Sequence, residues 1–426
     1  MTNPRPIRLA AALAAAVALA VPASAHAAGP APAADRPPAT GLASNQKLYV
    51  PPAGKAARDQ INAMRKAHRP EDADLIQAMV DQPSAVWFEG GTPEDIRKDV
   101  KTTMRRAAAQ KHSISVLVSY NIPYRDCSQY SEGGASGTEE YNAWIDGFAA
   151  GLGRGPAIII LEPDSLGIIP WYKPKGSDTY EWCQPEGGSD QLAADRFEQL
   201  NHAIDVLTQG NPGVRVYLDG THTGWLGVGD ITDRLLKAGV QRTAGFYVNA
   251  SNYQRTPQQL KYGSWISKCI ELSTKTWWQS EWCASQYYPA DPGDFSTWSK
   301  TDAAYDQAFA DTGFTFDPRA AKNFVVDTSR NGLGPWTPPA DHPAGDPQDW
   351  CNPPDRGLGL RPTLTTGDPL ADALLWIKTP GESDGSCTRW GPGPEDPVRG
   401  MVDPAAGVWF PEQALELARL AVPPLR

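Results

Sequence analysis

The sequence predicts an α/β fold, a distorted seven-stranded parallel β/α barrel of the TIM type in one domain over residues 44–426. Apolar β-rich runs recur along the chain, and each is followed by turn residues and a helical pattern, as in βα units. Most runs are continuously apolar, which is typical of parallel strands covered on both faces. The runs are Ala85–Phe88, Ser115–Ser119, Ala157–Leu161, Arg215–Leu218, Gly245–Val248, Asn323–Val326 and Ala373–Ile377.

The placement of polar residues favours a barrel over the alternative, a doubly wound sheet. Seven strands with intervening helices fit both architectures. A doubly wound sheet concentrates functional residues at one switch point, whereas a barrel collects them from many strand ends at one rim. Because candidate residues follow several different strands here, we expect a barrel.

Two segments between the strands carry clear helix signals. Thr92–Asp95 supplies a capping hydroxyl, a proline for the first turn and two acids at the positive end of the helix dipole. Ile96, Val100 and Met104 then repeat every four residues and predict one buried stripe. Residues 192–207 form a second amphipathic segment.

Three long stretches interrupt the alternation of strands and helices. Residues 171–190 are rich in glycine, proline and aromatic residues, residues 263–301 contain five tryptophans, and residues 332–369 are rich in proline. Long loops in a compact domain usually build a binding site or a lid. We therefore expect these stretches to border the functional site.

The N-terminal residues predict export. Arg5 and Arg8 precede the apolar run 9–21, and small residues at 23–25 can be cleaved, so residues 1–27 are interpreted as a signal peptide. The alternative, an uncleaved anchor, is disfavoured because the run is shorter than the ~20 residues of a membrane span. Residues 28–43 are Ala/Pro-rich and are predicted to be a disordered leader. We expect a secreted, soluble protein without a membrane partner.

The six cysteines and the net charge limit the classes of function. An even number of cysteines in an exported chain favours disulfides, although spacing alone leaves 15 pairings open. No Cys-x-x-Cys occurs, which argues against a thiolate zinc site. The net charge is −10 and no basic cluster occurs, which argues against nucleic acid or an anionic membrane as partner.

Asp126, Asp164, Asp219 and Asp384 each follow a different predicted strand or its loop. A single loop acid is most often a solvated surface group or a cap. Four of them are expected to meet at a barrel rim, because the rim brings the carboxyl ends of the strands together. There, one acid with a raised pKa can hold a proton while a second stays ionised and activates water.

Tryptophans in the same rim segments indicate a sugar chain as substrate. Trp87, Trp225, Trp336 and Trp350 either pack in the core or offer flat faces on which the apolar C–H faces of sugar rings stack. Lys378 ends the last apolar run beside Glu382, an unusual place for a solvated lysine, and His222 either joins the site or makes an ordinary loop contact. Other chemistries lack their motifs, since the sequence has no His-Glu-x-x-His and no Gly-x-Ser-x-Gly. We expect no metal and no cofactor.

The same segments resemble glycoside hydrolase family 6, the inverting cellulases. Tyr120–Cys127 resembles one family signature and Ile160–Leu166 the second. Five further segments follow in family order, so that the resemblance covers nearly all of residues 44–426, which it implies to be a catalytic domain. These segments are Leu218–Trp225, Asn249–Tyr253, Val326–Gly332, Trp350–Asn352 and Lys378–Gly385.

The resemblance implies a distorted seven-stranded β/α barrel that cleaves β-1,4-glucan. Asp164 matches the proton donor, and Asp126 matches a neighbour that raises the donor's pKa and helps handle water. Asp384 matches the proposed base and Asp219 a supporting carboxylate. Tyr120 matches a tyrosine that crowds the sugar at the cleavage point and favours ring distortion.

The resemblance also implies sugar-binding residues and disulfides. The positions that match sugar-binding residues are Trp87, His222, Trp225, Asn249, Trp350, Lys378 and Glu382. The family pairing implies Cys127–Cys183 and Cys351–Cys387, which leaves Cys269 to pair with Cys283. A family serine that holds the attacking water matches Ser131 or is displaced here.

The expected substrate is cellulose or a soluble β-1,4-glucan chain, and the expected state is a monomer. Compared with the compact endo-acting members of the family that the chain resembles, the stretches 171–190, 263–301 and 388–406 are long, which favours a roofed groove and release of cellobiose from chain ends. The short loop 133–138 favours an open cleft, and we expect internal cleavage on balance. The alternatives are an exo-acting cellobiohydrolase, an inactive secreted glucan-binding protein and an enzyme for another glucan, such as mixed-linkage β-glucan.

Overall fold

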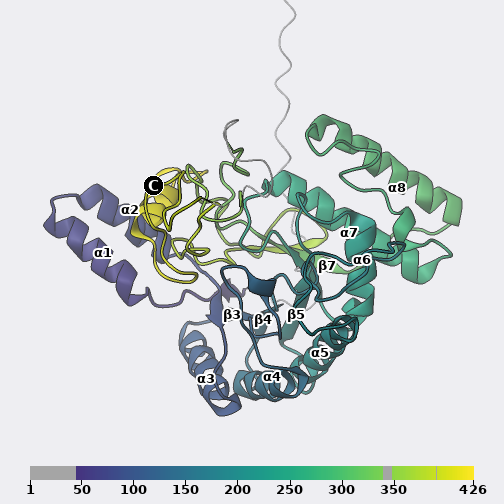
Figure 1. Ribbon diagram of the computed structural model, residues 1–426, viewed down its shortest axis with the longest axis horizontal. Helices are drawn as coiled ribbons and strands as arrows, with labels where there is room; N and C mark the ends of the chain where they lie inside the picture. The colour runs from purple at the N-terminus through teal and green to yellow at the C-terminus, as the bar shows by residue number, and fades with distance from the viewer. Residues whose placement is uncertain (1–44, 339–347, 390) are drawn as a thin grey trace, which may run out of the picture. The chain divides into compact units, whose positions relative to one another are not determined.

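Seven parallel strands form the centre of the structure, a computed structural model that describes residues 45–338, 348–389 and 391–426. The expected signal peptide and leader lie outside the described residues. All seven predicted strands are present and pair in chain order (Figure 1). They are β2 (Val86–Phe88), β3 (Ser113–Ser119), β4 (Ala157–Leu161), β5 (Val214–Asp219), β6 (Gly245–Val248), β7 (Asn323–Asp327) and β8 (Ala371–Leu375).

The sheet curls into a distorted barrel with an imperfect seam between its first and last strands, which confirms the predicted fold class. At this seam the amide of Ala85 donates to the carbonyl of Trp376 at 2.9 Å, and the Trp87 indole donates to the carbonyl of Ile377 at 2.8 Å. A short strand that was not predicted, β1 (Lys47–Leu48), pairs in parallel with β3. Its two residues are too few to give a sequence pattern.

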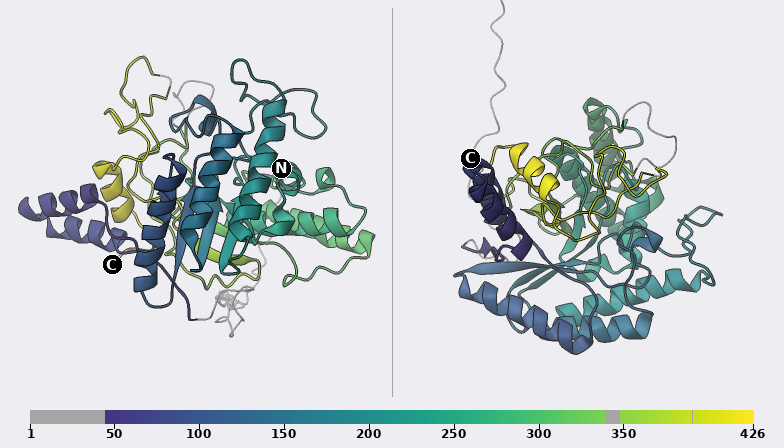
Figure 2. Two further views of the ribbon diagram at one scale, coloured as in Figure 1. Left: turned by 90° about the horizontal axis from the view of Figure 1, so that it is seen from below. Right: turned by 60° about the vertical axis from the view of Figure 1, so that its left-hand side comes forward.

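Helices cover the outside of the sheet. Figure 1 and Figure 2 show α3, α4 and α5 along the outer face of β3, β4 and β5, while the α1–α2 pair contacts α9 from the other end of the chain. The helices are α1 (Lys55–Lys66), α2 (Pro70–Val80), α3 (Pro93–Ala109), α4 (Thr138–Leu152), α5 (Gln191–Thr208), α6 (Val228–Lys237), α7 (Thr256–Lys275), α8 (Ser299–Thr312) and α9 (Pro411–Arg419). In the described part of the chain, no helix has both the length and the apolarity to cross a membrane.

The α3 and α5 helices confirm the two helix predictions. Thr92 and Asp95 form a capping box at the start of α3, in which each side chain accepts a hydrogen bond from the other residue's amide. Ile96, Val100 and Met104 are all buried, as the four-residue repeat predicts. Each such burial contributes about 1.5–3 kcal/mol relative to an exposed side chain.

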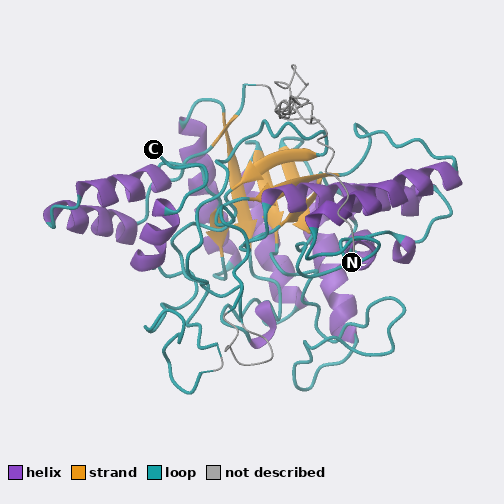
Figure 3. Ribbon diagram, turned by 90° about the horizontal axis from the view of Figure 1, so that it is seen from above, coloured by secondary structure: helices purple, strands orange, loops and turns teal. Residues whose placement is uncertain are grey.

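Apolar side chains pack on both faces of the strands, which explains their continuously apolar sequences. Leu117, Ile159 and Leu161 face the helices, whereas Val118 and Ile160 point into the barrel. The barrel interior is thus a packed core rather than a channel. The long loops gather beyond one end of the strands (Figure 3).

One loop prediction is wrong in part. The stretch 263–301 begins inside α7, which continues to Lys275, and the last residues belong to α8. Trp265 and Trp298 from this stretch are core residues whose rings contact each other. In contrast, residues 171–190 contain no helix or strand, as predicted.

Three disulfides hold the loops to the barrel. Cys127–Cys183 joins the loop after β3 to the stretch 171–190, and Cys351–Cys387 joins the two segments that flank β8. Cys269–Cys283 anchors the connection that follows α7. These are the three pairs expected above.

Candidate active site

The carboxyl ends of the strands surround a cavity of about 810 Å³. It brings together nearly all of the residues singled out from the sequence, and three of them, Asp219, Asn249 and Trp336, lie outside its lining. The expected residues that line it are Trp87, Tyr120, Asp126, Asp164, His222, Trp225, Trp350, Lys378, Glu382 and Asp384. Ser131, in the segment where a water-holding serine was expected, also lines the cavity.

A strained turn after β4 presents Asp164 to the cavity. Glu162 and Asp164 both have left-handed backbone angles, with φ of 48° and 66°, which non-glycine residues rarely adopt. The buried Glu162 carboxylate accepts hydrogen bonds from the amides of Asn121 (2.8 Å) and Ile122 (2.9 Å). This contact fixes the turn against the loop after β3.

A buried arginine locks the same two loops. Arg196 on α5 donates to the carbonyl oxygens of Ser165 (2.8 Å) and Ile168 (2.7 Å) in the Asp164 turn. It also donates to the carbonyl of Pro123, at 2.7 Å, in the loop that carries Asp126. The positions of Asp164 and Asp126 are therefore coupled through one side chain.

Asp164 is the carboxyl best suited to hold a proton. Its side chain is partly buried, and no described residue donates a hydrogen bond to its carboxyl. Burial raises the pKa of Asp164 well above its usual value, and the charges of Asp219, Asp126 and Asp384 raise it further. A raised pKa lets this carboxyl keep its proton at a higher pH than an ordinary aspartate does.

Asp384 has the opposite environment. Its Oδ2 accepts hydrogen bonds from Arg330 Nη1 (2.8 Å), Tyr253 Oη (3.2 Å) and the amide of Asn352 (3.0 Å), and Lys378 Nζ lies 3.5 Å from its Oδ1. Burial alone would raise the pKa of Asp384, but the Arg330 and Lys378 cations hold it below its usual value. Asp384 therefore stays ionised and can accept a proton.

Asp126 lies in the loop after β3, in a left-handed conformation with φ of 59°. Its Oδ2 accepts a hydrogen bond from the amide of Ser131 at 2.7 Å. Burial raises the pKa of Asp126 to about 6, and the charge of Asp384 adds to this effect. Asp126 is therefore mostly ionised at neutral pH and acts on Asp164 as a negative charge.

Asp219 lies outside the lining of the cavity and contacts the turn that carries Asp164. The buried carboxylate accepts hydrogen bonds from the amides of Leu166 and Gly167, both at 3.1 Å, and from the amide of Thr221 at 2.8 Å. These bonds hold the end of the Asp164 turn, and the charge of Asp219 raises the pKa of Asp164. The supporting role expected for Asp219 stays a prediction.

Aromatic rings flank the carboxyls. The Trp87 ring meets the Tyr120 ring edge-on, with centroids 5.3 Å apart, and the Trp350 ring lies 6.0 Å from Tyr130. The ring centroids of His222 and Trp225 lie 5.6 Å apart. Flat aromatic surfaces are thus available at several places along the cavity.

Polar side chains complete the lining. His222 Nδ1 accepts a hydrogen bond from the amide of Gly224 at 3.1 Å, and burial lowers the pKa of His222 to about 4. The neutral ring therefore carries its proton on Nε2 and can donate it to a ligand. Lys378 donates to the carbonyl of Ser383 at 3.0 Å, and burial raises the pKa of Glu382.

One expected sugar contact is not supported by the structure. Asn249 is fully buried, and its side-chain amide donates to the carbonyl of Asp327 at 2.9 Å while its Oδ1 accepts from the amide of Gln254 at 3.0 Å. These contacts use the amide to hold the loop after β6. Asn249 therefore shapes the site instead of lining it.

Sequence reasoning missed several residues that set the electrostatics. Arg330 and Tyr253 were noted within matched segments but were given no role, and Glu162 and Arg196 carried no separate signal. Trp182 also lines the cavity and is 55% exposed. The sequence could have indicated Trp182 as a lining residue, because it lies in the long stretch 171–190.

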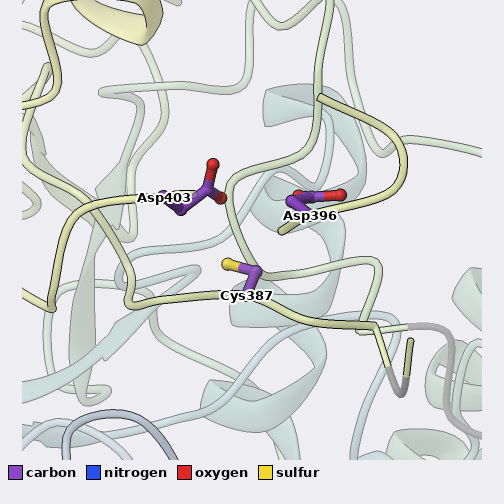
Figure 4. A group of neighbouring side chains, drawn as sticks. All are labelled: Cys387, Asp396 and Asp403. Atoms are coloured by element: carbon purple, nitrogen blue, oxygen red, sulfur yellow. The ribbon is translucent and has the colours of Figure 1, made fainter. Parts of the chain in front are cut away.

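A second group of acids, drawn in Figure 4, does not suit a metal ion. Cys387, Asp396 and Asp403 lie close together. The Cys387 sulfur is bonded to Cys351, so it is not a thiolate. Asp396 accepts two hydrogen bonds from Arg389 Nε, at 2.9 and 3.1 Å, and Asn352 donates to Asp403 at 2.9 Å. These groups brace the segment around Asp384.

Known proteins match almost the whole chain. Residues 43–421 match glycosyl hydrolases family 6. Endoglucanase 1 of Streptomyces sp. (strain KSM-9) is 32% identical over 344 residues, which cover 80% of this chain and 74% of that protein. Endoglucanase A of Cellulomonas fimi is 32% identical over 82% of this chain, which spans 57% of that protein.

A solved structure agrees with these relatives. The endoglucanase Cel6 from Mycobacterium tuberculosis, solved in complex with methyl-cellobiosyl-4-deoxy-4-thio-β-D-cellobioside, is 31% identical, with a TM-score of 0.63. The match covers 90% of this chain and 99% of that one. The chain therefore belongs to glycosyl hydrolases family 6.

Proposed function

We propose that this protein is an inverting glycoside hydrolase that cleaves β-1,4-glucosidic bonds in cellulose and soluble β-1,4-glucans. One observation carries the proposal: Asp164 and Asp384 line the same cavity, and their surroundings move their pKa values in opposite directions. Inverting hydrolysis requires two carboxyls with different pKa values, one that donates a proton and one that accepts a proton.

In the proposed reaction, Asp164 gives its proton to the glycosidic oxygen as the bond between that oxygen and C1 breaks. A water molecule forms a new bond to C1 from the opposite face, and its proton passes to Asp384. Inversion requires the two carboxyls to stand about 6.5–9.5 Å apart, so that the water fits between them and the sugar. Asp126 and Ser131 line the same cavity and are the proposed neighbours of that water.

The lining suits a neutral sugar chain. Trp87, Trp225 and Trp350 offer flat faces for sugar rings, and His222, Lys378 and Glu382 offer hydrogen-bonding groups for hydroxyls. Tyr120 lies against Trp87, where it can crowd the ring at the cleavage point and favour a distorted sugar. We assign these residues to substrate binding on that basis.

Internal cleavage is the proposed mode of action. The endoglucanase names of the relatives above support it. A specific observation favours the alternative: Ala405 and Ala406, at the end of the stretch 388–406, line the cavity and place this stretch where a roof would lie. A roofed groove would favour release of cellobiose from chain ends.

Viscosity measurements distinguish the two modes. Carboxymethylcellulose loses viscosity after few internal cuts, whereas cuts at chain ends release sugar with little change in viscosity. We expect a steep loss of viscosity per reducing end released. A slow loss with rapid sugar release would contradict internal cleavage, and no reducing ends at all would contradict enzymatic activity.

Secretion as a monomer completes the proposal. The three disulfides support secretion, because disulfides form and persist in oxidising compartments. The signal-like residues 1–27 support it as well. Detection of the protein in culture medium, and its mass by light scattering, test the two statements.

A further inference from the structure

We propose that Trp277 and Trp282 form a second glucan-binding surface outside the cavity, on the connection between α7 and α8. Trp277 is 58% exposed and Trp282 51% exposed. Together with Trp278 they form a cluster whose ring centroids lie 5.6–6.0 Å apart. We call these three residues the tryptophan cluster. The inference rests on the proposed function, because it identifies a further contact for the same substrate.

Exposure of these rings calls for an explanation. An indole carries a large apolar surface that is usually largely buried, and neighbouring exposed aromatics often mark an interaction site. Trp265 and Trp298 already pack in the core next to this connection, because both side chains are buried. Trp278 packs against the core, whereas the exposed rings of Trp277 and Trp282 are available to a partner.

The tryptophan cluster is held firmly against the segment that carries Trp225. The disulfide Cys269–Cys283 fixes the connection to α7. The buried Gln286 donates from Nε2 to the carbonyls of Thr223 (3.1 Å) and Leu226 (3.0 Å), on either side of Trp225. A platform fixed in this way loses little conformational entropy when it binds a ligand.

Aromatic residues continue from the cavity towards the cluster. Trp225 lines the cavity, and Tyr287, which is 43% exposed, donates a hydrogen bond to the carbonyl of Trp225 at 3.0 Å. Ser280–Trp282 packs against α6, which begins at Val228, three residues after Trp225. The proposed path of a chain that leaves the cavity past Trp225 runs over Tyr287 to the tryptophan cluster.

The charges around the tryptophan cluster are paired, which favours a neutral ligand. Lys175 lies 2.5 Å from Glu281, and this ion pair also links the stretch 171–190 to the cluster. On α6, Arg234 pairs with Asp230 at 2.8 Å and Lys237 with Asp233 at 2.7 Å. Flat aromatic rings without a surplus of charge suit a neutral polysaccharide better than a nucleic acid or an anionic membrane.

The test compares a long substrate with a short one. The double variant Trp277→Ala/Trp282→Ala is expected to bind swollen cellulose about fivefold to tenfold more weakly in depletion isotherms, because two stacking surfaces are lost. Its kcat/KM on cellotetraose should stay within about twofold of wild type, since a short chain fills the cavity alone. Replacement of both tryptophans by tyrosine should restore most of the cellulose binding.

Phe295→Ala is the matched control, because Phe295 lies on the same connection, is 42% exposed and contacts Trp298 rather than the cluster. Unchanged cellulose binding by the double variant, or an equal loss in the control, would overturn the proposal. Wild-type self-association that disappears in the double variant would overturn it too, because the cluster would then bind a second copy. If wild type does not cleave cellotetraose, the proposed function fails, while the isotherms still test the surface.

Discussion

Arg330 donates a hydrogen bond to Asp384 at 2.8 Å, and both side chains are buried. A buried carboxylate without a partner would take up a proton, so this ion pair keeps Asp384 charged. Asp164 lines the same cavity, yet no described residue donates a hydrogen bond to its carboxyl. The two surroundings therefore move the pKa values of Asp164 and Asp384 in opposite directions.

Arg330→Gln should move the acid limb of the pH profile of kcat/KM upwards by roughly one unit. The reason is that Arg330 lowers the pKa of Asp384, so the variant needs a higher pH to ionise its base. Arg330→Lys keeps the charge and should show a smaller shift. Identical acid limbs in wild type and both variants would contradict this role.

Asp126→Asn should move the alkaline limb to lower pH by roughly one unit. The Asp126 charge raises the pKa of Asp164, so its removal lets Asp164 lose its proton earlier. Glu132→Gln is a suitable control, because Glu132 also lines the cavity and lies in the same loop. If the two variants shift the limb equally, a general change of charge rather than Asp126 is responsible.

Asp164→Asn should raise the melting temperature at pH 8 by about 2 °C or more, with a smaller effect at pH 4. The pKa of Asp164 is raised by burial in the folded protein, so its stabilising contribution is present at low pH. That contribution is lost as pH rises from the unfolded pKa towards the folded pKa, whereas asparagine does not titrate. Calorimetry at both pH values checks the prediction, which an equal or lower melting temperature at pH 8 would refute.

Asp164→Asn should also reduce kcat on cellotetraose by about 10³-fold, while binding to swollen cellulose survives. The loss should be much smaller on 2,4-dinitrophenyl β-cellobioside, because its leaving group departs without a proton. Initial rates of wild type and variant on both substrates measure the two losses. Equal losses on the two substrates would show that Asp164 has a role other than proton donation.

The strands could be predicted because burial on two faces gives each strand a continuous run of apolar residues. In Ala157–Leu161 every residue is buried, and the predicted and observed limits coincide. The α7 helix shows the opposite case, since residues 263–275, which include Trp265 and Cys269, were assigned to a loop. Both residues are buried on the core-facing side of one helix. Their residue types are unusual for a helix, so the helical spacing was not recognised in the sequence.

The site was predictable in its residues but less so in their contacts. The four aspartates follow strand ends, and the barrel brings them to one place. Arg330 and Asp384 are 54 residues apart, and a single sequence contains no sign that they pair. Asn249 illustrates the same limit, because its residue type suits a sugar contact and a loop contact equally, and the structure uses it for the loop.

The stereochemistry of the first product tests the central claim most directly, namely that Asp164 and Asp384 act from opposite sides of one glycosidic bond. Cellohexaose is mixed with the enzyme, and ¹H NMR records the anomeric protons before mutarotation equilibrates them. An initial excess of the α-anomer at the new reducing end is predicted, because water attacks C1 opposite the leaving oxygen. An initial excess of the β-anomer would contradict the assignment of both carboxyls.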